Sequence, residues 1–260
     1  MPYIEKDSIR YFRFSEFDPK QVRHGIFTRS GGVSPKPWKS LNLGGTVGDD
    51  QSRVMENKKR VLEILNCESG SLFEVHQVHK ARVLVAEEPR DRTQEIPKAD
   101  AVITNNPEVT LLMRFADCVP LLFFDQGQEV IGLAHAGWKG TLQKIALKTI
   151  QSMMEIYGTK PEEVVAGIGP SIGPDHYQVR EDVIKKVKAS FPNTYPHLLR
   201  EEEGTVRLNL WEANRQALRE TGVQRIEVAG ICTACHVRDW FSHRAEHGTT
   251  GRFGALITLI

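Results

Sequence analysis

The sequence lacks an excess of charge of either sign. It holds 34 Lys and Arg against 33 Asp and Glu in 260 residues, which gives a formal net charge of +1. Proteins that mainly bind nucleic acid or an anionic membrane surface need a clear surplus of Lys and Arg to neutralise phosphates. We therefore expect neither nucleic acid nor a membrane as a partner.

The sequence also lacks a long hydrophobic run and is poor in cysteine. No apolar stretch approaches the ~20 residues that span a bilayer. The N-terminal sequence MPYIEKDSIRYFRF mixes polar and aromatic residues, unlike a signal peptide. Four cysteines are too few for a disulfide scaffold. These absences predict a cytoplasmic, globular protein with reduced thiols.

Two of the cysteines, Cys232 and Cys235, stand in the sequence CTACH, which matches the C-x-x-C-H signature of c-type haem attachment. Haem attachment requires export, and no export signal is visible. A redox dithiol is a second interpretation, but the preceding IEVAGI lacks a thioredoxin context. We expect structural roles for both and for Cys67, because free cysteine is among the most buried residue types.

Short apolar runs, each about the length of a buried strand, recur along the chain. They predict strands at 72–75, 82–86, 101–104, 109–113, 119–124, 130–134, 164–168, 226–230 and 254–260. Apolar stripes at helical spacing predict helices near 54–65, 142–157, 183–191 and 210–218. Because strands outnumber helices without strict alternation, the pattern favours a mixed α/β (α+β) fold with mixed β-sheets flanked by helices. The charged stretch 86–100 is expected to be a surface loop, so that residues 1–260 form a single domain.

Three segments place metal-ligand residue types beside predicted buried strands. They are EVHQVHKARV with His76 and His79, RFADCVPLLFF with Asp117 and Cys118, and GLAHAGWKGT with His135. Two imidazoles and one thiolate suit Zn²⁺, and three protein ligands leave a fourth position for a water whose pKa falls towards ~7. The same residue types also allow copper or a Cys nucleophile with a His base. Because the segments are far apart in sequence, their spacing does not choose among these chemistries.

Other segments offer groups for an anionic or sugar-bearing substrate. Lys139 lies in AHAGWKGT just before a predicted helix start, where free N–H groups attract phosphate. Neither a Walker loop nor a complete dinucleotide fingerprint is present, since GIGPSIGP lacks the third glycine. The stretch WFSHRAEHGTTGRFG either binds phosphate or is an ordinary charged loop; its candidates are Ser242, His243, Arg244 and Arg252.

Eight segments, in order along nearly the whole chain, resemble the YfiH/laccase-domain family, and its bacterial YlmD-like members in particular. They are HGIFTRSGGVS (24–34), SLNLGGTVGDD (40–50), QVHKARV (77–83), ADAVIT (99–104), ADCVPLLFFD (116–125), GLAHAGWKGT (132–141), GIGPSIGPDHYQV (167–179) and WFSHRAEHGTTGR (240–252). The family carries the older label polyphenol oxidoreductase and a later one, purine nucleoside phosphorylase. Eight ordered segments are far more specific than any single motif.

The resemblance implies a zinc-dependent enzyme that cleaves adenosine, inosine, guanosine and methylthioadenosine with phosphate, and that also deaminates adenosine at the same site. It implies zinc ligands at His79, Cys118 and His135, with His76 outside the ligand set. The implied fold is mixed α/β, similar to a Cys/His deamidating toxin domain. Asp117, which precedes Cys118, is a candidate acid/base group, so that the expected catalytic residues are Cys118, Asp117 and His135.

The remaining site predictions concern substrate contacts. Compared with the family pattern, Lys58 and Lys139 replace arginines, Lys80 replaces a glycine, and Val47 replaces a polar residue; lysine supplies charge without a bidentate fork. The expected contacts to phosphate, ribose or base are Asn42, Lys58, Arg60, Lys139, Ser242 and Arg244. Three alternatives stay open: a copper-dependent polyphenol oxidase, a Cys/His amide hydrolase acting on cell-wall precursors, and a non-enzymatic zinc-stabilised interaction module.

Overall fold

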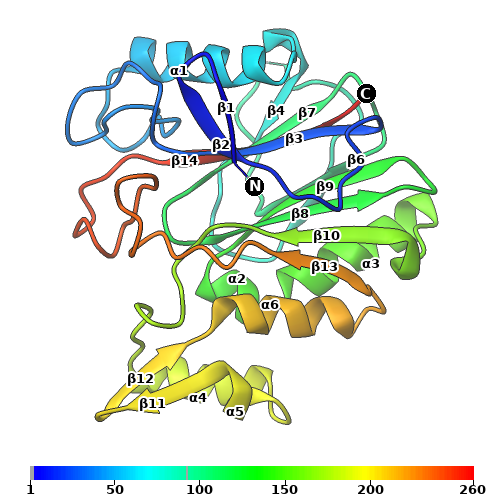
Figure 1. The fold of residues 1–260 in the computed structure, drawn as a ribbon. Coiled ribbons are helices and arrows are strands. Elements are labelled where there is room, and N and C mark those ends of the chain that lie inside the picture. The colour runs from blue at the N-terminus through cyan, green and yellow to red at the C-terminus, as the bar shows by residue number, and fades with distance from the viewer. Residues whose placement is uncertain (1–2, 92) are drawn as a thin grey trace.

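A computed structural model describes residues 3–91 and 93–260, whose elements form four main layers (Figure 1). Helix α1 (Gln51–Ile64) covers the outer face of one six-stranded sheet, and a second six-stranded sheet packs against the inner face. The outer face of the second sheet is covered by α2 (Trp138–Leu142), α3 (Ile145–Tyr157) and α6 (Leu210–Arg219). The expected fold class, mixed sheets flanked by helices, is confirmed.

The first sheet contains the N- and C-terminal strands. Its order is β1 (Tyr3–Lys6), β2 (Ile9–Phe12), β3 (Val22–Phe27), β14 (Phe253–Leu259), β7 (Thr110–Phe115) and β4 (Leu72–Glu74). Neighbouring strands are antiparallel except for β4 and β7, which are parallel. Strand β14 therefore lies in the middle of the sheet, between a strand from the first thirty residues and one from the centre of the chain.

The second sheet is built mainly from the middle of the chain. Its order is β13 (Arg225–Val228), β10 (Val164–Ile168), β8 (Val119–Asp125), β9 (Val130–Ala136), β6 (Ala101–Thr104) and β5 (Val83–Val85). Strands β8 and β9 form an antiparallel pair at its centre, in a register that places Pro120 opposite His135. The edge strands β13 and β5 are parallel to their neighbours.

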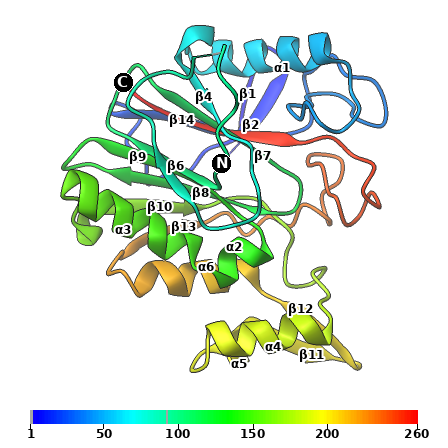
Figure 2. The same ribbon diagram turned by 180° about the vertical axis from the view of Figure 1, so that it is seen from behind.

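A smaller group of elements extends beyond the helical layer of the second sheet (Figure 2). It contains α4 (Glu181–Ser190), α5 (Tyr195–Leu198) and a hairpin of β11 (Leu199–Glu202) and β12 (Thr205–Leu208). Two short 3₁₀ turns, Ser69–Ser71 and Pro161–Glu163, precede β4 and β10. None of the helices in the described part of the chain is long and apolar enough to cross a membrane.

The sequence of strand β8 is a continuous apolar run because both faces of the strand are buried. Leu121 and Phe123 point into the core beneath the helices, whereas Leu122 and Phe124 point into the core between the two sheets. Successive side chains of a strand face opposite sides, so a strand buried on both faces needs apolar residues throughout. Full burial of each such side chain contributes roughly 1.5–3 kcal/mol to the hydrophobic stabilisation of the fold.

All nine predicted strands are present, with boundaries that differ by up to two residues. The prediction missed β1, β2 and β3, whose sequences interrupt apolar residues with charges, His24 and Gly25, and it also missed the hairpin strands β11 and β12. The helical stripe at 142–157 belongs to two helices, because Lys144 between them adopts a left-handed conformation (φ 57°). The expected surface loop contributes no helix or strand at residues 86–91 and 93–100.

His24 is a buried titratable group in β3, in the core between the sheets. Its side chain packs against Phe14 and Phe17, and its Nε2 accepts a hydrogen bond from the Phe14 backbone N–H at 3.0 Å. Burial, reinforced by the charge of Arg13, lowers the pKa of His24 to about 3. The His24 imidazole therefore stays neutral in the folded protein at pH ~6.5, where the same side chain gains a proton in the unfolded chain.

This burial predicts a specific loss of stability in acid. Because the pKa of His24 is lower in the folded chain (about 3) than in the unfolded one (~6.5), the unfolded state binds more protons below pH 6.5. From this residue alone, we expect the free energy of unfolding to be about 2 kcal/mol lower at pH 5 than at pH 7. Urea unfolding of the wild type and of His24→Gln at both pH values tests this. The variant, whose amide oxygen can accept the same hydrogen bond, should have the weaker pH dependence; equal dependence in the two proteins contradicts the assignment.

Candidate metal centre and active site

Cys118 lies where the chain crosses from one sheet to the other. Strand β7 ends at Phe115 in the first sheet, and β8 begins at Val119 in the second. Between them, Asp117 has a φ of 79°, a conformation that non-glycine residues adopt rarely and at a cost. Its carboxylate accepts hydrogen bonds from the Thr233 hydroxyl (2.7 Å) and the Arg244 backbone N–H (2.6 Å), which hold this turn in place.

His135 reaches the same point through strand pairing. The β8–β9 register sets Pro120 opposite His135, so that the imidazole lies next to the start of β8. Gly137 lies two residues after His135, and its backbone packs against the side chains of Cys118 and His79. A Cβ atom there would lie 2.9 Å from the Cys118 Sγ and 3.4 Å from the His79 Cδ2. Only glycine leaves room at position 137 for the thiol and the imidazole in these positions.

His79 lies in the loop after β4, and one buried carboxylate fixes both this loop and His135. Asp100 accepts hydrogen bonds from the backbone N–H groups of Val78 (3.3 Å), His79 (2.9 Å) and Lys80 (2.8 Å). Its Oδ1 also lies 2.9 Å from the His135 Nδ1. With Nδ1 engaged in this way, the His135 Nε2 is the nitrogen left to face Cys118.

These three elements bring together the predicted ligand residues. One ligand atom each from His79, Cys118 and His135 lies within 4.8 Å of the other two. The two imidazole rings are edge to face, with centroids 4.8 Å apart. Three such donors match an open, catalytic type of zinc site, and Asp100 supplies the carboxylate that commonly orients a ligating histidine. Two imidazoles and one thiolate also suit copper, so the residues fit a metal without deciding which one.

The protonation state of Cys118 favours metal binding, whereas His135 must lose a proton before its Nε2 can bind a metal. Burial alone would raise the pKa of the Cys118 thiol, but the charge of His135 and hydrogen bonds from both imidazoles lower it to about 6. Burial would likewise lower the pKa of His135, yet the Cys118 thiolate and the Asp100 carboxylate raise it to about 9. A thiolate is therefore already present near neutral pH, which is the form of cysteine that binds metals or attacks electrophiles.

The Asp100 contacts give the next prediction. Asp100→Asn removes the negative charge and half of the acceptor capacity that hold His79 and His135. We expect the metal affinity of the site to fall by about 10–100-fold, as is typical when the partner of a ligating histidine is lost. Competition with a chromophoric chelator measures the affinity, and Asp91→Asn, in an exposed loop, is the matched control. Unchanged affinity in Asp100→Asn would contradict this orienting role.

The three candidate ligand residues line a pocket of about 540 Å³ that is rich in positive charge. None of the described residues that line it is Asp or Glu. The lining residues are Gly44, Gly45, Thr46, Gln51, Lys58, His76, Gln77, His79, Ile96, Arg114, Ala116, Cys118, His135, His243 and Arg252. This volume lies within the range of small-molecule sites.

The three cations of the pocket differ in how far their charge is neutralised. Lys58 (2.8 Å) and Arg114 (3.2 Å) share one carboxylate, that of Glu74. Arg252 forms no ion pair within residues 3–91 and 93–260, and its guanidinium donates only to the carbonyls of Thr250 and Gly251. Burial lowers the pKa of Arg252, but nearby anionic groups oppose this. A part-buried cation without a carboxylate partner is suited to bind an anionic ligand.

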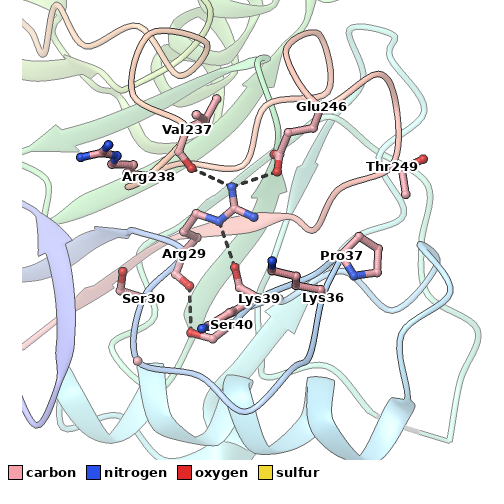
Figure 3. A pocket seen from close by; sticks show the side chains of 11 residues that line it. Arg29, Ser30, Lys36, Pro37, Lys39, Ser40, Val237, Arg238, Glu246 and Thr249 are labelled. Atoms are coloured by element: carbon pink, nitrogen blue, oxygen red, sulfur yellow. Dashed lines mark hydrogen bonds and ion pairs between the residues drawn. The ribbon is translucent and has the colours of Figure 1, made fainter.

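A larger pocket, of about 820 Å³, lies elsewhere and has no comparable chemistry (Figure 3). Its central cation, Arg29, is fully engaged. The guanidinium donates to the carbonyls of Lys39 (2.9 Å) and Val237 (2.7 Å) and forms an ion pair with Glu246 at 3.0 Å. No group of metal-ligand residues lies among the described residues that line it. The smaller pocket is therefore the better candidate active site.

Of the six predicted substrate contacts, only Lys58 lines the metal pocket. Asn42 is buried behind it, and its Oδ1 accepts the backbone N–H groups of Gly44 (2.9 Å) and Arg252 (2.8 Å). Asn42 thus positions two lining residues. Ser242 is also buried, and its Oγ accepts a hydrogen bond from the Ala245 N–H at 3.1 Å.

The other three predicted contacts are cations outside the described lining. Arg60 pairs with Glu56 on the same helix at 2.8 Å. The Lys139 ammonium lies 5.6 Å from the centre of the adjacent indole ring of Trp138. The Arg244 guanidinium lies over Tyr177. Their proposed roles with phosphate stay predictions.

Sequence reasoning did not single out Asp100 or Arg114 as site residues. His76, placed outside the ligand set, has an exposed side chain that lines the pocket, and His243 lines it as well. Asp100 stands directly before the predicted buried strand 101–104, and this position could have marked it as a candidate site residue. No comparable signal marked Arg114, because its place in the pocket depends on the pairing of β7 with β4.

Comparison with known proteins shows to which family the chain belongs. The family described as multi-copper polyphenol oxidoreductase laccase matches residues 23–260. The chain belongs to this family. The resemblance drawn from the eight sequence segments is thereby confirmed.

Relatives in the same family cover almost the whole chain. The purine nucleoside phosphorylase YlmD of Bacillus subtilis is 34% identical over 247 residues, which are 92% of this chain and 88% of that protein. A purine nucleoside phosphorylase of Deinococcus radiodurans is 37% identical over 238 residues, covering 92% and 89%. Among solved structures, a hypothetical protein YfiH of Bacillus licheniformis is 34% identical, with a TM-score of 0.92 and coverage of 100% and 99%. The named activities of these relatives indicate that the family member described here is an enzyme.

Proposed function

We propose that this chain is a purine nucleoside phosphorylase that uses a zinc ion held by His79, Cys118 and His135. The observation that carries the proposal is the pocket itself. A metal-ligand triad and three cations line one cavity of about 540 Å³ that has no acidic group among its described lining residues. The names of the relatives support the same activity.

Phosphorolysis needs phosphate held near the C1′ atom of the nucleoside. A phosphate oxygen forms a bond to C1′ as the C1′–N9 bond breaks, and the electron pair of that bond leaves with the purine, which takes up a proton. Arg252, Lys58 and Arg114 supply the positive charge for phosphate, with Arg252 the one that lacks an ion-pair partner among the described residues. Such preorganised charge commonly provides the largest part of catalysis.

The departing purine also needs a proton. His76 and His243 line the pocket, and histidine is the side chain that exchanges protons near neutral pH. Asp117, expected to act as an acid/base group, has both carboxylate oxygens engaged by Thr233 and Arg244. We therefore assign the proton transfer to the histidines and a positioning role to Asp117, which holds the turn that carries Cys118.

We also propose that the same pocket deaminates adenosine. In that reaction water adds at C6 and ammonia leaves, which converts adenosine to inosine. A bound zinc ion supplies the Lewis acidity that this chemistry requires. The proposed substrates are adenosine, inosine, guanosine and methylthioadenosine, and the proposed location is cytoplasmic.

Product analysis tests the proposal. Purified protein loaded with zinc is incubated with adenosine, with and without phosphate. We expect adenine and ribose 1-phosphate only when phosphate is present, and inosine in both reactions. If none of the three products forms, the enzyme assignment is wrong. Because the family description names copper, the metal content and the oxidation of a phenol are measured in parallel; phenol oxidation that depends on copper would favour the oxidase instead.

A second candidate function rests on one specific observation. The Cys118 thiol, the His135 imidazole and the Asp100 carboxylate form a chain of contacts that resembles the triad of a cysteine amide hydrolase. In that function the Cys118 thiolate would attack the amide carbon, the amine would leave with a proton from His135 as the C–N bond breaks, and water would then release the acyl group from the sulfur. Chelated, metal-free protein that still cleaves amide substrates such as cell-wall precursors would support it, whereas loss of all turnover on chelation would exclude it.

A further inference from the structure

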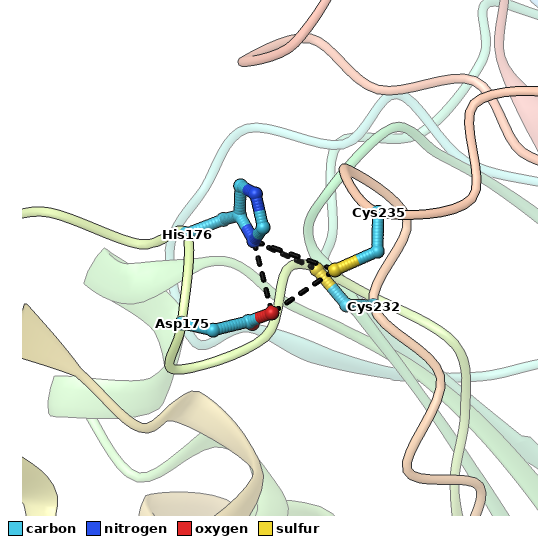
Figure 4. Close-up of side chains that lie close together, drawn as sticks. All are labelled: Asp175, His176, Cys232 and Cys235. Atoms are coloured by element: carbon cyan, nitrogen blue, oxygen red, sulfur yellow. Dashed lines mark hydrogen bonds and ion pairs between the residues drawn. The ribbon is translucent and has the colours of Figure 1, made fainter.

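Four side chains with metal-binding atoms meet outside the pocket, where two loops pack together (Figure 4). Asp175 and His176 lie in the loop after β10, and Cys232 and Cys235 lie in the segment after β13. One carboxylate oxygen, one imidazole nitrogen and the two sulfur atoms all lie within 4.8 Å of one another. None of the four lines the pocket described above.

The distances within this group are close to those of a tetrahedral metal site. The His176 Nδ1 lies 3.0 Å from the Asp175 Oδ2, 3.4 Å from the Cys235 Sγ and 3.8 Å from the Cys232 Sγ. The Cys235 Sγ lies 3.0 Å from the Asp175 Oδ2. Zinc bonds of about 2.0–2.3 Å at tetrahedral angles place neighbouring ligand atoms about 3.3–3.8 Å apart. Only small movements of the side chains are therefore needed to enclose an ion.

We propose that Asp175, His176, Cys232 and Cys235 bind a second zinc ion, of the closed structural type. Four protein ligands leave no open position for substrate, and two thiolates favour zinc over Mg²⁺ or Ca²⁺. The two cysteines have the C-x-x-C spacing of structural zinc sites. The backbone N–H of Gly173 also donates to the Cys232 Sγ at 3.2 Å, a contact of the kind that orients metal-binding groups.

The second site joins two loops that support the first. Ser171 and Cys232 form an isolated parallel bridge, and the Thr233 N–H donates to the Ser171 carbonyl at 3.0 Å. Thr233, between the two cysteines, also donates its hydroxyl proton to Asp117. The Ile172 N–H donates to the Asp117 carbonyl at 3.0 Å. An ion held at the second site therefore braces, from both loops, the turn that presents Cys118.

Metal counting on variants tests the proposal. Each protein is saturated with zinc, freed of excess and analysed by mass spectrometry for zinc per chain. We expect two ions in the wild type and in Cys67→Ser, a control in a cysteine that belongs to neither group. Cys235→Ser and Cys118→Ser should each hold one ion, and the double variant none. If Cys235→Ser holds as much zinc as the wild type, the proposal is wrong.

Two further measurements do not depend on that one variant. In Asp175→Asn, which keeps the volume of the side chain, zinc affinity at the second site should fall at least ~10-fold. Cys235 is exposed, so iodoacetamide should label it in chelated protein but not in zinc-loaded protein. Equal labelling with and without zinc, or a mass 2 Da lower from a Cys232–Cys235 disulfide in the zinc-loaded protein, overturns the proposal.

Discussion

Replacement of Cys118 by alanine is expected to remove the pocket metal and nearly all turnover. Cys118 supplies the only thiolate of this triad, and its pKa of about 6 makes it an anion near neutral pH. Two neutral imidazoles alone bind zinc weakly at an open site. We expect kcat/KM for adenosine phosphorolysis to fall by about 10³-fold or more, which corresponds to ~4 kcal/mol of transition-state stabilisation. Zinc per chain should fall by one ion.

The matched control is Cys67→Ala. Cys67 is a half-buried cysteine that packs beside α1, and burial raises the pKa of its thiol. This variant should keep its zinc and its activity, so that any general effect of losing a thiol is subtracted. A Cys118→Ala protein with wild-type zinc content and full activity would exclude the assigned site.

Arg252→Ala is expected to separate phosphorolysis from deamination. Arg252 is the pocket cation without an ion-pair partner among the described residues, and phosphate is the ligand that supplies the missing negative charge. We expect kcat/KM for phosphate to fall by about 10²–10³-fold, as when one preorganised donor is lost. Deamination of adenosine uses no phosphate and should fall much less. Initial rates of adenine and inosine formation across a phosphate series measure both.

Deamination in the same protein serves as the internal control for Arg252, because its guanidinium also donates to the carbonyls of Thr250 and Gly251. A collapsed pocket would lose both reactions together, and that result would contradict a specific role with phosphate. Arg60→Ala is the matched arginine control, since the Arg60 side chain pairs with Glu56 outside the described lining. Arg252→Lys should restore only part of the activity, because lysine lacks the bidentate fork.

The sequence was sufficient to predict most of the fold and to identify three candidate metal ligands that the structure brings together. Buried strands such as β8 are continuous apolar runs because both of their faces are covered. This pattern can be recognised in the sequence without knowing which strands pair with one another. His79, Cys118 and His135 were identified as ligand types beside such strands. Their convergence depends on the β8–β9 register and on the crossing of the chain between the sheets, which no local pattern encodes. The family resemblance supplied that information.

The substrate contacts were harder to predict, because the availability of a charge depends on tertiary partners. Arg60 and Arg252 are the same residue type, yet one is paired within its own helix and the other lines the pocket beside Cys118. The contact of Asn42 with substrate stays a prediction; in the structure its amide oxygen fixes the backbone of Gly44 and Arg252. Cys235 was expected to have a structural role, and only the packing of two distant loops places it beside Asp175, where it forms part of the proposed structural zinc site.

The most direct test of the central claim follows the oxygen atoms of phosphate. Zinc-loaded protein is incubated with adenosine and phosphate carrying ¹⁸O at all four positions, and the sugar product is analysed by mass spectrometry. If phosphate held by Arg252 attacks C1′ in this pocket, the product is ribose 1-phosphate that retains all four labelled oxygens. Unlabelled free ribose, or adenosine that is recovered without release of adenine, would contradict the account.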